Sequence, residues 1–216
     1  MTESRSSLLV IGLMLALLTL VGCGGKIRRP SYYVLNLPAP VSAAPPTTST
    51  LGSVGVGKFD APRFLRVGPI AYRESPEQLD FYDYHQWAED PRRAITVAMM
   101  EELQARGLFQ SVELFNGHSS PECLVTGTID HLEEVDQGSD VSVEVALSAR
   151  LINVRTGEVL WKGTSTKNAK VSQRSVPAVV AQMSQEVRDV VQGLVSSMQA
   201  RVLATLPSPS RANAER

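Results

Sequence analysis

The sequence VSVEVALSARL, residues 141–151, alternates between apolar and polar side chains over most of its length. Valine, leucine or alanine stands at every second position, while Ser142, Glu144 and Arg150 are among the residues between them. This two-residue period is typical of a β-strand that buries one face and exposes the other. We therefore predict a strand at residues 141–153, in a sheet that is covered on one side only.

Further strands are predicted on both sides of this stretch, because the neighbouring segments are rich in β-branched and aromatic residues. Gly157 lies in the short connection after residue 153, where a hairpin commonly needs a positive φ. The predicted strands and extended segments comprise residues 31–37, 53–59, 64–73, 111–115, 123–132 and 158–166.

Two helices are predicted from capping residues and from apolar residues at helical spacing. Asp90 can cap the first helix, Pro91 suits its first turn, and Gly107 ends it. The second helix has one apolar stripe from Val180 to Val202, which corresponds to about 25 residues and ~38 Å of helix.

The order of these elements is strands, a helix, several antiparallel strands and a long helix. This order predicts an α+β fold in which two main helices pack on one face of a mostly antiparallel sheet. The chain has 216 residues, of which 43% are hydrophobic and 20% charged. That composition is typical of a single globular domain.

The N-terminus has the features of an export signal. Residues 8–21, LLVIGLMLALLTLV, carry no charge and are too few to span a bilayer as a helix. The end of this segment with the two residues that follow it, Leu20-Val21-Gly22-Cys23, resembles the lipobox of bacterial lipoproteins, in which the cysteine is diacylated, the signal is cleaved before it, and the cysteine is acylated again. We predict a lipoprotein signal peptide at residues 1–22 and lipidation at Cys23; an ordinary signal with an incidental cysteine is the alternative.

The mature chain is expected to divide into three parts. Residues 23–52 comprise the lipidated cysteine, a tether, the first strand and a Pro/Thr-rich linker, residues 53–206 the folded domain, and residues 207–216 a disordered tail. Gly24, rather than aspartate, follows Cys23. By resemblance to envelope lipoproteins, this favours the outer membrane and a body on its periplasmic face.

Charge and cysteine content exclude several classes of function. Lysine plus arginine total 21 and aspartate plus glutamate 22, a balance unlike that of a nucleic-acid-binding protein. Cys23 and Cys123 are too few for a disulfide scaffold or a cysteine-based zinc site. Cys123 shares an alternating face with Val125 and Ile129, so we expect a buried, inert thiol.

No motif predicts catalysis, a cofactor or a metal. The sequence GSVGVGK, residues 52–58, superficially matches a phosphate-binding loop, but Phe59 replaces the required serine or threonine. His85, His118 and His131 are isolated from one another. A G-x-S-x-G nucleophile motif is absent.

An acidic cluster follows the strand predicted at residues 123–132. His131, Glu133, Glu134 and Asp136 could suggest acid-base chemistry. Because they precede Gly138 at the predicted end of the strand, we expect a solvated loop instead.

An aromatic segment precedes the first predicted helix and contains Phe81, Tyr82, Tyr84 and Trp87. Such a segment can pack over the sheet or form a recognition edge. We expect packing to be the first role, and assign Tyr84 and Trp87 as candidate partner-binding residues.

The body resembles the ABC-type transport auxiliary lipoproteins, the PqiC-like family that accompanies MCE-domain lipid transport systems. The matching pieces are Tyr32-Tyr-Val-Leu35, Phe59-Asp-Ala-Pro62, Ile70-Ala-Tyr-Arg73, Tyr84-His-Gln-Trp-Ala-Glu89 with Pro91, and Leu103 to Phe109. The resemblance implies a periplasmic α+β domain, without catalytic residues, that assists an MCE protein, its permease and its ATPase. A lipid-anchored periplasmic hydrolase and a scaffold or regulator of envelope enzymes are the alternatives.

Overall fold

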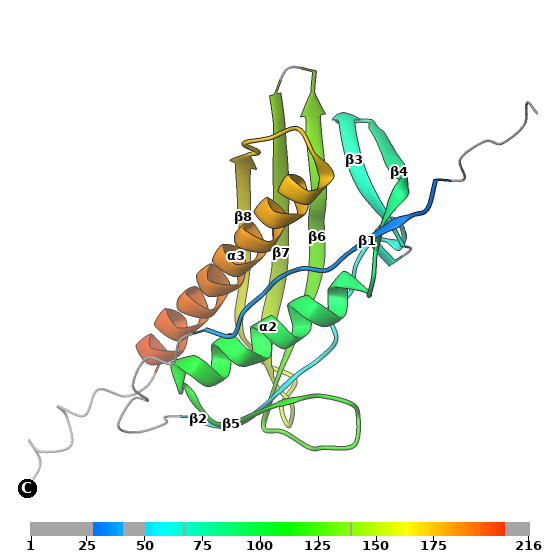
Figure 1. Ribbon diagram of the computed structural model, residues 1–216. Coiled ribbons are helices and arrows are strands. Elements are labelled where there is room, and N and C mark those ends of the chain that lie inside the picture. The colour runs from blue at the N-terminus through cyan, green and yellow to red at the C-terminus, as the bar shows by residue number, and fades with distance from the viewer. Residues whose placement is uncertain (1–27, 41–50, 67, 139, 206–216) are drawn as a thin grey trace, which may run out of the picture.

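The computed structural model describes residues 28–40, 51–66, 68–138 and 140–205, and contains one sheet with two α-helices on it (Figure 1). The predicted signal peptide, Cys23 and the tail at residues 207–216 lie outside the described residues. In these ranges no helix has the length and apolar character needed to cross a membrane.

Three long antiparallel strands form one side of the sheet. They are β6 (Cys123–Gln137), β7 (Asp140–Asn153) and β8 (Val159–Lys170). Gly157 and Gly138 have φ values of 73° and 77°, respectively, so a glycine in the left-handed region lies at each of the two turns. The alternation of β7 is confirmed, since Val143, Leu147 and the other odd-numbered residues from 141 to 151 are buried.

The remaining strands lie on the other side of β6, where β2 and β3 both pair with it and begin two branches of a fork. The sheet order is β1-β4-β3-β6-β2-β5, while β7 and β8 extend from the opposite edge of β6. β2 pairs with the start of β6 and β3 with its end, both in parallel. The strands of the fork are β1 (Ser31–Tyr33), β2 (Leu51–Val56), β3 (Pro69–Ser75), β4 (Gln78–Trp87) and β5 (Phe109–Leu114).

Both helices cover one face of the sheet (Figure 1). α2 (Pro91–Arg106) begins after Asp90, whose side chain accepts from the Arg92 amide, and ends at Gly107 with φ 61°. α3 (Val176–Thr205) is 30 residues long and packs on β7 and β8. The α+β fold, the mostly antiparallel sheet and the caps of the first helix are therefore confirmed.

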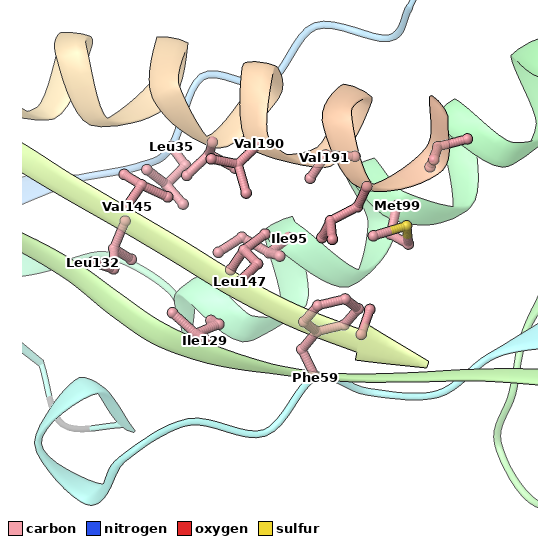
Figure 2. Packing of buried hydrophobic residues seen from close by; sticks show 14 of the residues in the cluster. Leu35, Phe59, Ile95, Met99, Ile129, Leu132, Val145, Leu147, Val190 and Val191 are labelled. Atoms are coloured by element: carbon pink, nitrogen blue, oxygen red, sulfur yellow. The ribbon is translucent and has the colours of Figure 1, made fainter. Parts of the chain in front are cut away.

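The core lies between this face and the helices (Figure 2). Phe59 packs over β6 at Gly127, where a Cβ atom would overlap the phenyl ring. A glycine is thus required at this position for close packing. The residues shown around Phe59 include Ile129 and Leu132 of β6, Val145 and Leu147 of β7, Ile95 and Met99 of α2, and Val190 and Val191 of α3.

Two predicted extended segments differ from the structure. The strand predicted at residues 31–37 ends at Tyr33, because the chain then crosses the helices, where the Asn36 amide donates to Ser184 Oγ at 3.1 Å. Residues Arg63–Arg66 form a 3₁₀ turn rather than extended chain, closed by the Leu65 amide and the Pro62 carbonyl at 3.0 Å.

Candidate interaction surface

The short ladder between β1 and β4 presents aromatic residues both to the core and to solvent. The two strands run parallel, with Ser31, Tyr32 and Tyr33 opposite His85, Gln86 and Trp87. Since successive side chains on a strand point to opposite faces, Tyr32 and Tyr33 lie in different surroundings.

Trp87 belongs to the core. Its side chain is 6% exposed, and its amide donates to the Gly68 carbonyl at 2.6 Å. The next amide, of Ala88, donates to the Tyr33 carbonyl at 2.8 Å. Trp87 thereby anchors the end of β4 directly before the N-cap of α2, in agreement with the packing role expected of it.

Tyr84, in contrast, faces solvent. It is 43% exposed, and the Arg28 guanidinium carbon lies 5.9 Å from its ring centroid. Tyr32 is 62% exposed and pairs with Gln86, two residues from Tyr84. We call these two tyrosines, with the exposed side chains of Val34 and Phe81, the aromatic edge. The structure therefore separates the two predicted partner-binding residues, because only Tyr84 is accessible.

A chain of ring contacts connects this ladder to the end of β6. The centroid distances are 5.5 Å from Tyr33 to His85, 5.4 Å from His85 to Tyr82, and 4.9 Å from Tyr82 to Tyr72. The Tyr33 hydroxyl lies 2.9 Å from His85 Nδ1, and the Tyr82 hydroxyl donates to Glu134 Oε2 at 2.8 Å. Tilted and edge-to-face ring contacts, together with polar contacts, thus hold the β1–β4 ladder in place.

The prediction of a solvated acidic loop is wrong for Glu133 and Glu134. Both lie within β6, at 0% and 2% exposure. Arg73 donates to both oxygens of Glu133, at 2.6 and 3.2 Å. The expectation failed because β6 continues to Gln137; the tight turn at Gly138 was the available signal that both strands of the hairpin extend to it.

The environment of Glu134 favours its protonated form. Burial raises the pKa of Glu134, and the hydrogen bond from Tyr82 opposes that effect. Burial, together with the contact to Glu134, raises the pKa of Tyr82. Asp136, at the end of the strand, is bonded to Arg174 on the surface.

The ligand atoms of His131, Glu133 and Glu144 all lie within 4.8 Å of one another. A metal ion placed among them would compete with Arg73, which already engages both oxygens of Glu133. His131 Nδ1 also lies 3.2 Å from Glu133 Oε1. Because Glu133 is already paired with Arg73, the arrangement suits a metal poorly.

Two further sequence motifs have structural roles. Gly57 donates its amide to the Val125 carbonyl at 2.8 Å, so the amide is not available to a phosphate loop. Cys123 is 7% exposed, and burial followed by the nearby Glu122 raises the pKa of its thiol. The buried Cys123 expected from the sequence is confirmed.

The structure is similar to solved bacterial proteins over most of its length. Protein XCC0632 of Xanthomonas campestris, described with the DUF330 family, is 19% identical, with 81% of this chain and 98% of that chain covered and a TM-score of 0.68. A second, uncharacterized protein is 14% identical, with 78% and 97% covered and a TM-score of 0.61. At such identities the likeness supports the fold.

No curated protein sequence matches the chain. The profile of the ABC-type transport auxiliary lipoprotein component matches residues 33–195, well over half of the sequence. This range includes β4, both capped ends of α2 and the complete β6–β7–β8 meander. The chain therefore belongs to the ABC-type transport auxiliary lipoprotein family.

Proposed function

We propose that this lipoprotein is a non-catalytic auxiliary component of an MCE/ABC-type intermembrane lipid transport system. It is anchored to the periplasmic face of the outer membrane through Cys23 and docks to the MCE protein of that system, which also contains the permease and the ATPase. The observation that carries the docking proposal is the aromatic edge, since exposed tyrosines are enriched at protein interfaces.

The position of the edge is compatible with the proposed anchor. Cys23 precedes Arg28 by five residues, which span at most about 18 Å when extended. Arg28 in turn lies over Tyr84 of the edge. Under this proposal, residues 1–22 are removed, residues 23–52 tether the body, and residues 53–206 form the auxiliary domain with a tail at 207–216.

The chemistry of the reactive groups supports a non-catalytic role. Cys123 is buried and its raised pKa disfavours a thiolate nucleophile. Glu133 is held by Arg73, and Glu134 accepts from Tyr82. Both carboxyl groups are therefore engaged in holding strands together.

The cavity beside β3 and β6 suits an acyl chain poorly, which favours docking over the carriage of a lipid. A cavity of about 490 Å³ next to β3 and β6 is lined by Arg73, Glu74, His131, Gln137 and Glu144, among others. Acyl chains need an apolar enclosure, whereas seven of the nine residues that line this cavity are charged or polar. The apolar face of the sheet is instead filled by the two helices.

Retention of the full-length protein by its MCE protein tests the docking proposal. Replacing both Tyr32 and Tyr84 with alanine should lower retention by about tenfold or more, because aromatic side chains commonly dominate binding energy at interfaces. The matched control replaces Val154 and Val159 with alanine. These residues are 49% and 50% exposed at the β7–β8 turn, and their replacement should leave retention unchanged. Equal retention of both double variants would remove the aromatic edge from the interface. About one phospholipid per chain with no retention of the wild type would favour a carrier.

The anchor is tested separately. Cys23→Ser should leave a precursor that is unprocessed or mislocalised, since only a thiol forms the thioether to the lipid. Membrane fractionation and incorporation of labelled palmitate measure this outcome. A serine variant that is still labelled and still fractionates with the outer membrane would contradict lipidation at Cys23.

A further inference from the structure

The sheet face opposite the helices carries two pairs of like charges that face each other across neighbouring strands. Glu133 of β6 lies opposite Glu144 of β7, and Arg150 of β7 lies opposite Lys162 of β8. Like charges in directly opposed positions destabilise a sheet. Each pair therefore needs a compensating charge.

One member of the acidic pair, Glu133, is compensated within the chain. Arg73 from β3 binds both oxygens of Glu133, and His131 lies 3.2 Å from the same carboxylate. The cation is partly buried, with 22% of the Arg73 side chain exposed. Arg73 also interacts electrostatically with Glu144, the other member of the pair.

The basic pair has no such compensation. Arg150 uses its Nε to donate to the Thr126 hydroxyl at 3.1 Å. Across residues 28–40, 51–66, 68–138 and 140–205, no carboxylate lies within 4.0 Å of the Arg150 or Lys162 nitrogens. Two neighbouring cations thus remain available for an anion from outside the chain.

These cations form one wall of a groove of about 350 Å³. Its floor consists of short residues of β6 and β7, including Thr126, Thr128 and Ser148, and the opposite wall contains Lys58 and Asp60. The Asp60 bridge to Thr128 places that wall beside β6, whereas Lys162 stands on the far side of β7. Long charged side chains at the rims and short side chains in the centre create the depression.

Asp60, the carboxylate among the residues that line the groove, already has cationic partners. Asp60 is bonded to Arg66, and Arg92 lies 4.0 Å from the same oxygen. Lys58 pairs with Asp90 at 3.1 Å. The charge of the residues that line the groove is therefore positive, despite the net charge of −1 of the whole chain. Asp130, which accepts from the Ser148 hydroxyl of the floor, adds one carboxylate beside the groove.

We propose that this groove binds the phosphate group of an anionic ligand. A guanidinium supplies several fixed donors, an ammonium adds a second positive charge, and threonine hydroxyls can donate from the floor. A tetrahedral phosphate offers acceptor oxygens to all three kinds of donor at once. The bound anion would lie between Arg150 and Lys162 and relieve their repulsion. This site is separate from the aromatic edge and does not depend on docking there.

Calorimetric titration at constant ionic strength tests the site, with the full-length protein in a non-ionic detergent. Inorganic phosphate and dihexanoyl phosphatidylglycerol are the two probes. Arg150→Gln/Lys162→Gln should weaken binding by about tenfold or more, because two charge-assisted interactions are lost. Arg155→Gln/Lys167→Gln removes the same charge at exposed positions outside the groove and should stay within about twofold of the wild type.

Each result has a defined meaning. Binding of inorganic phosphate that depends on Arg150 and Lys162 supports a soluble phosphate ligand. Binding of the phosphatidylglycerol alone, with the same dependence, supports a lipid headgroup. Absence of binding for both probes, or equal loss in both double variants, overturns the proposal.

A third variant guards against a trivial loss of folding. Lys162→Glu places a carboxylate opposite Arg150 and should abolish phosphate binding while the unfolding midpoint is maintained or raised. If this variant binds phosphate like the wild type, the groove is not the site.

Discussion

The β6–β7–β8 meander and the β1–β4 ladder belong to one sheet, but different interactions hold them. The meander has long antiparallel ladders, and the inner face of β7, its middle strand, is buried under the helices. The ladder has three paired positions, and its side chains interact through rings, hydroxyls and carboxylates. Apolar burial therefore stabilises the meander, whereas polar contacts at the junction with β6 determine the position of the β1–β4 ladder.

The largest effect is expected where the two regions meet, at Arg73. Arg73→Met should lower the free energy of unfolding by about 4 kcal/mol, because it leaves the fully buried Glu133 carboxylate without its guanidinium partner. Denaturant unfolding of the full-length protein measures the loss. Arg73→Met/Glu133→Leu removes both charges and should recover most of it. A single variant as stable as the wild type would show that the pair does not hold β3 to β6.

A somewhat smaller effect is expected at the inner side of the ladder. Trp87→Ala should cost about 3 kcal/mol, since it empties a buried aromatic site next to the start of α2. Tyr84→Ala, on the exposed side, is the matched control and should change stability by less than about 0.5 kcal/mol. Comparable losses in the two variants would mean that the ladder is not divided into a structural and an accessible side.

The N-cap of α2 should contribute less. Partial burial acts to raise the pKa of Asp90, but bonds from Arg92 and Lys58 outweigh it and lower the pKa to about 2. Asp90→Ala should cost about 1 kcal/mol at neutral pH. Because the folded pKa is depressed, this contribution is present above pH 3.8 and is lost as the pH falls towards 2. Unfolding free energies of both proteins between pH 2 and 7 should therefore converge at the acidic end, and a constant difference would contradict the assignment.

The smallest effect is a change in how stability depends on pH, and its sign is opposite to that expected for Asp90. Burial raises the pKa of Glu134, so the folded state binds a proton more tightly than the unfolded state. Stability should accordingly fall as the pH rises from the ordinary glutamate value of 4.5 through the raised pKa. Glu134→Gln keeps an acceptor for Tyr82 without the charge and should remove this part of the slope. Denaturant unfolding at several pH values measures this dependence. If the wild type and Glu134→Gln lose stability equally with rising pH, the pKa of Glu134 is not raised by folding.

Local patterns were sufficient for the elements of the meander and the helices. The alternation at residues 141–151, the cap at Asp90 and the stripe from Val180 to Val202 each depend on residues close in sequence. Such signals can be recognised without knowing which segments pack against the element, because strand and helix periods are properties of the backbone. The buried position of Trp87 also agrees with the packing role expected of it.

The same reasoning failed where distant segments meet. Glu133 and Glu134 looked like a solvated strand end, yet partners from β3 and β4, Arg73 and Tyr82, lie against them and allow their burial. The accessible neighbour of Tyr84 is Tyr32, from a strand more than fifty residues earlier. Neither pairing leaves a periodic signal in the chain.

By itself the sequence determined the α+β class, the capped helix, the amphipathic strand and the lipobox-like cysteine, since periodicity, capping and composition act over a few neighbouring residues. The tertiary structure alone decided that β6 pairs with both β2 and β3, that Glu133 and Glu134 are buried, and that Arg150 faces Lys162. Strand order and register arise from contacts between residues far apart in the chain. The free energy of those contacts depends on burial and on partners that appear only when the whole sheet has assembled.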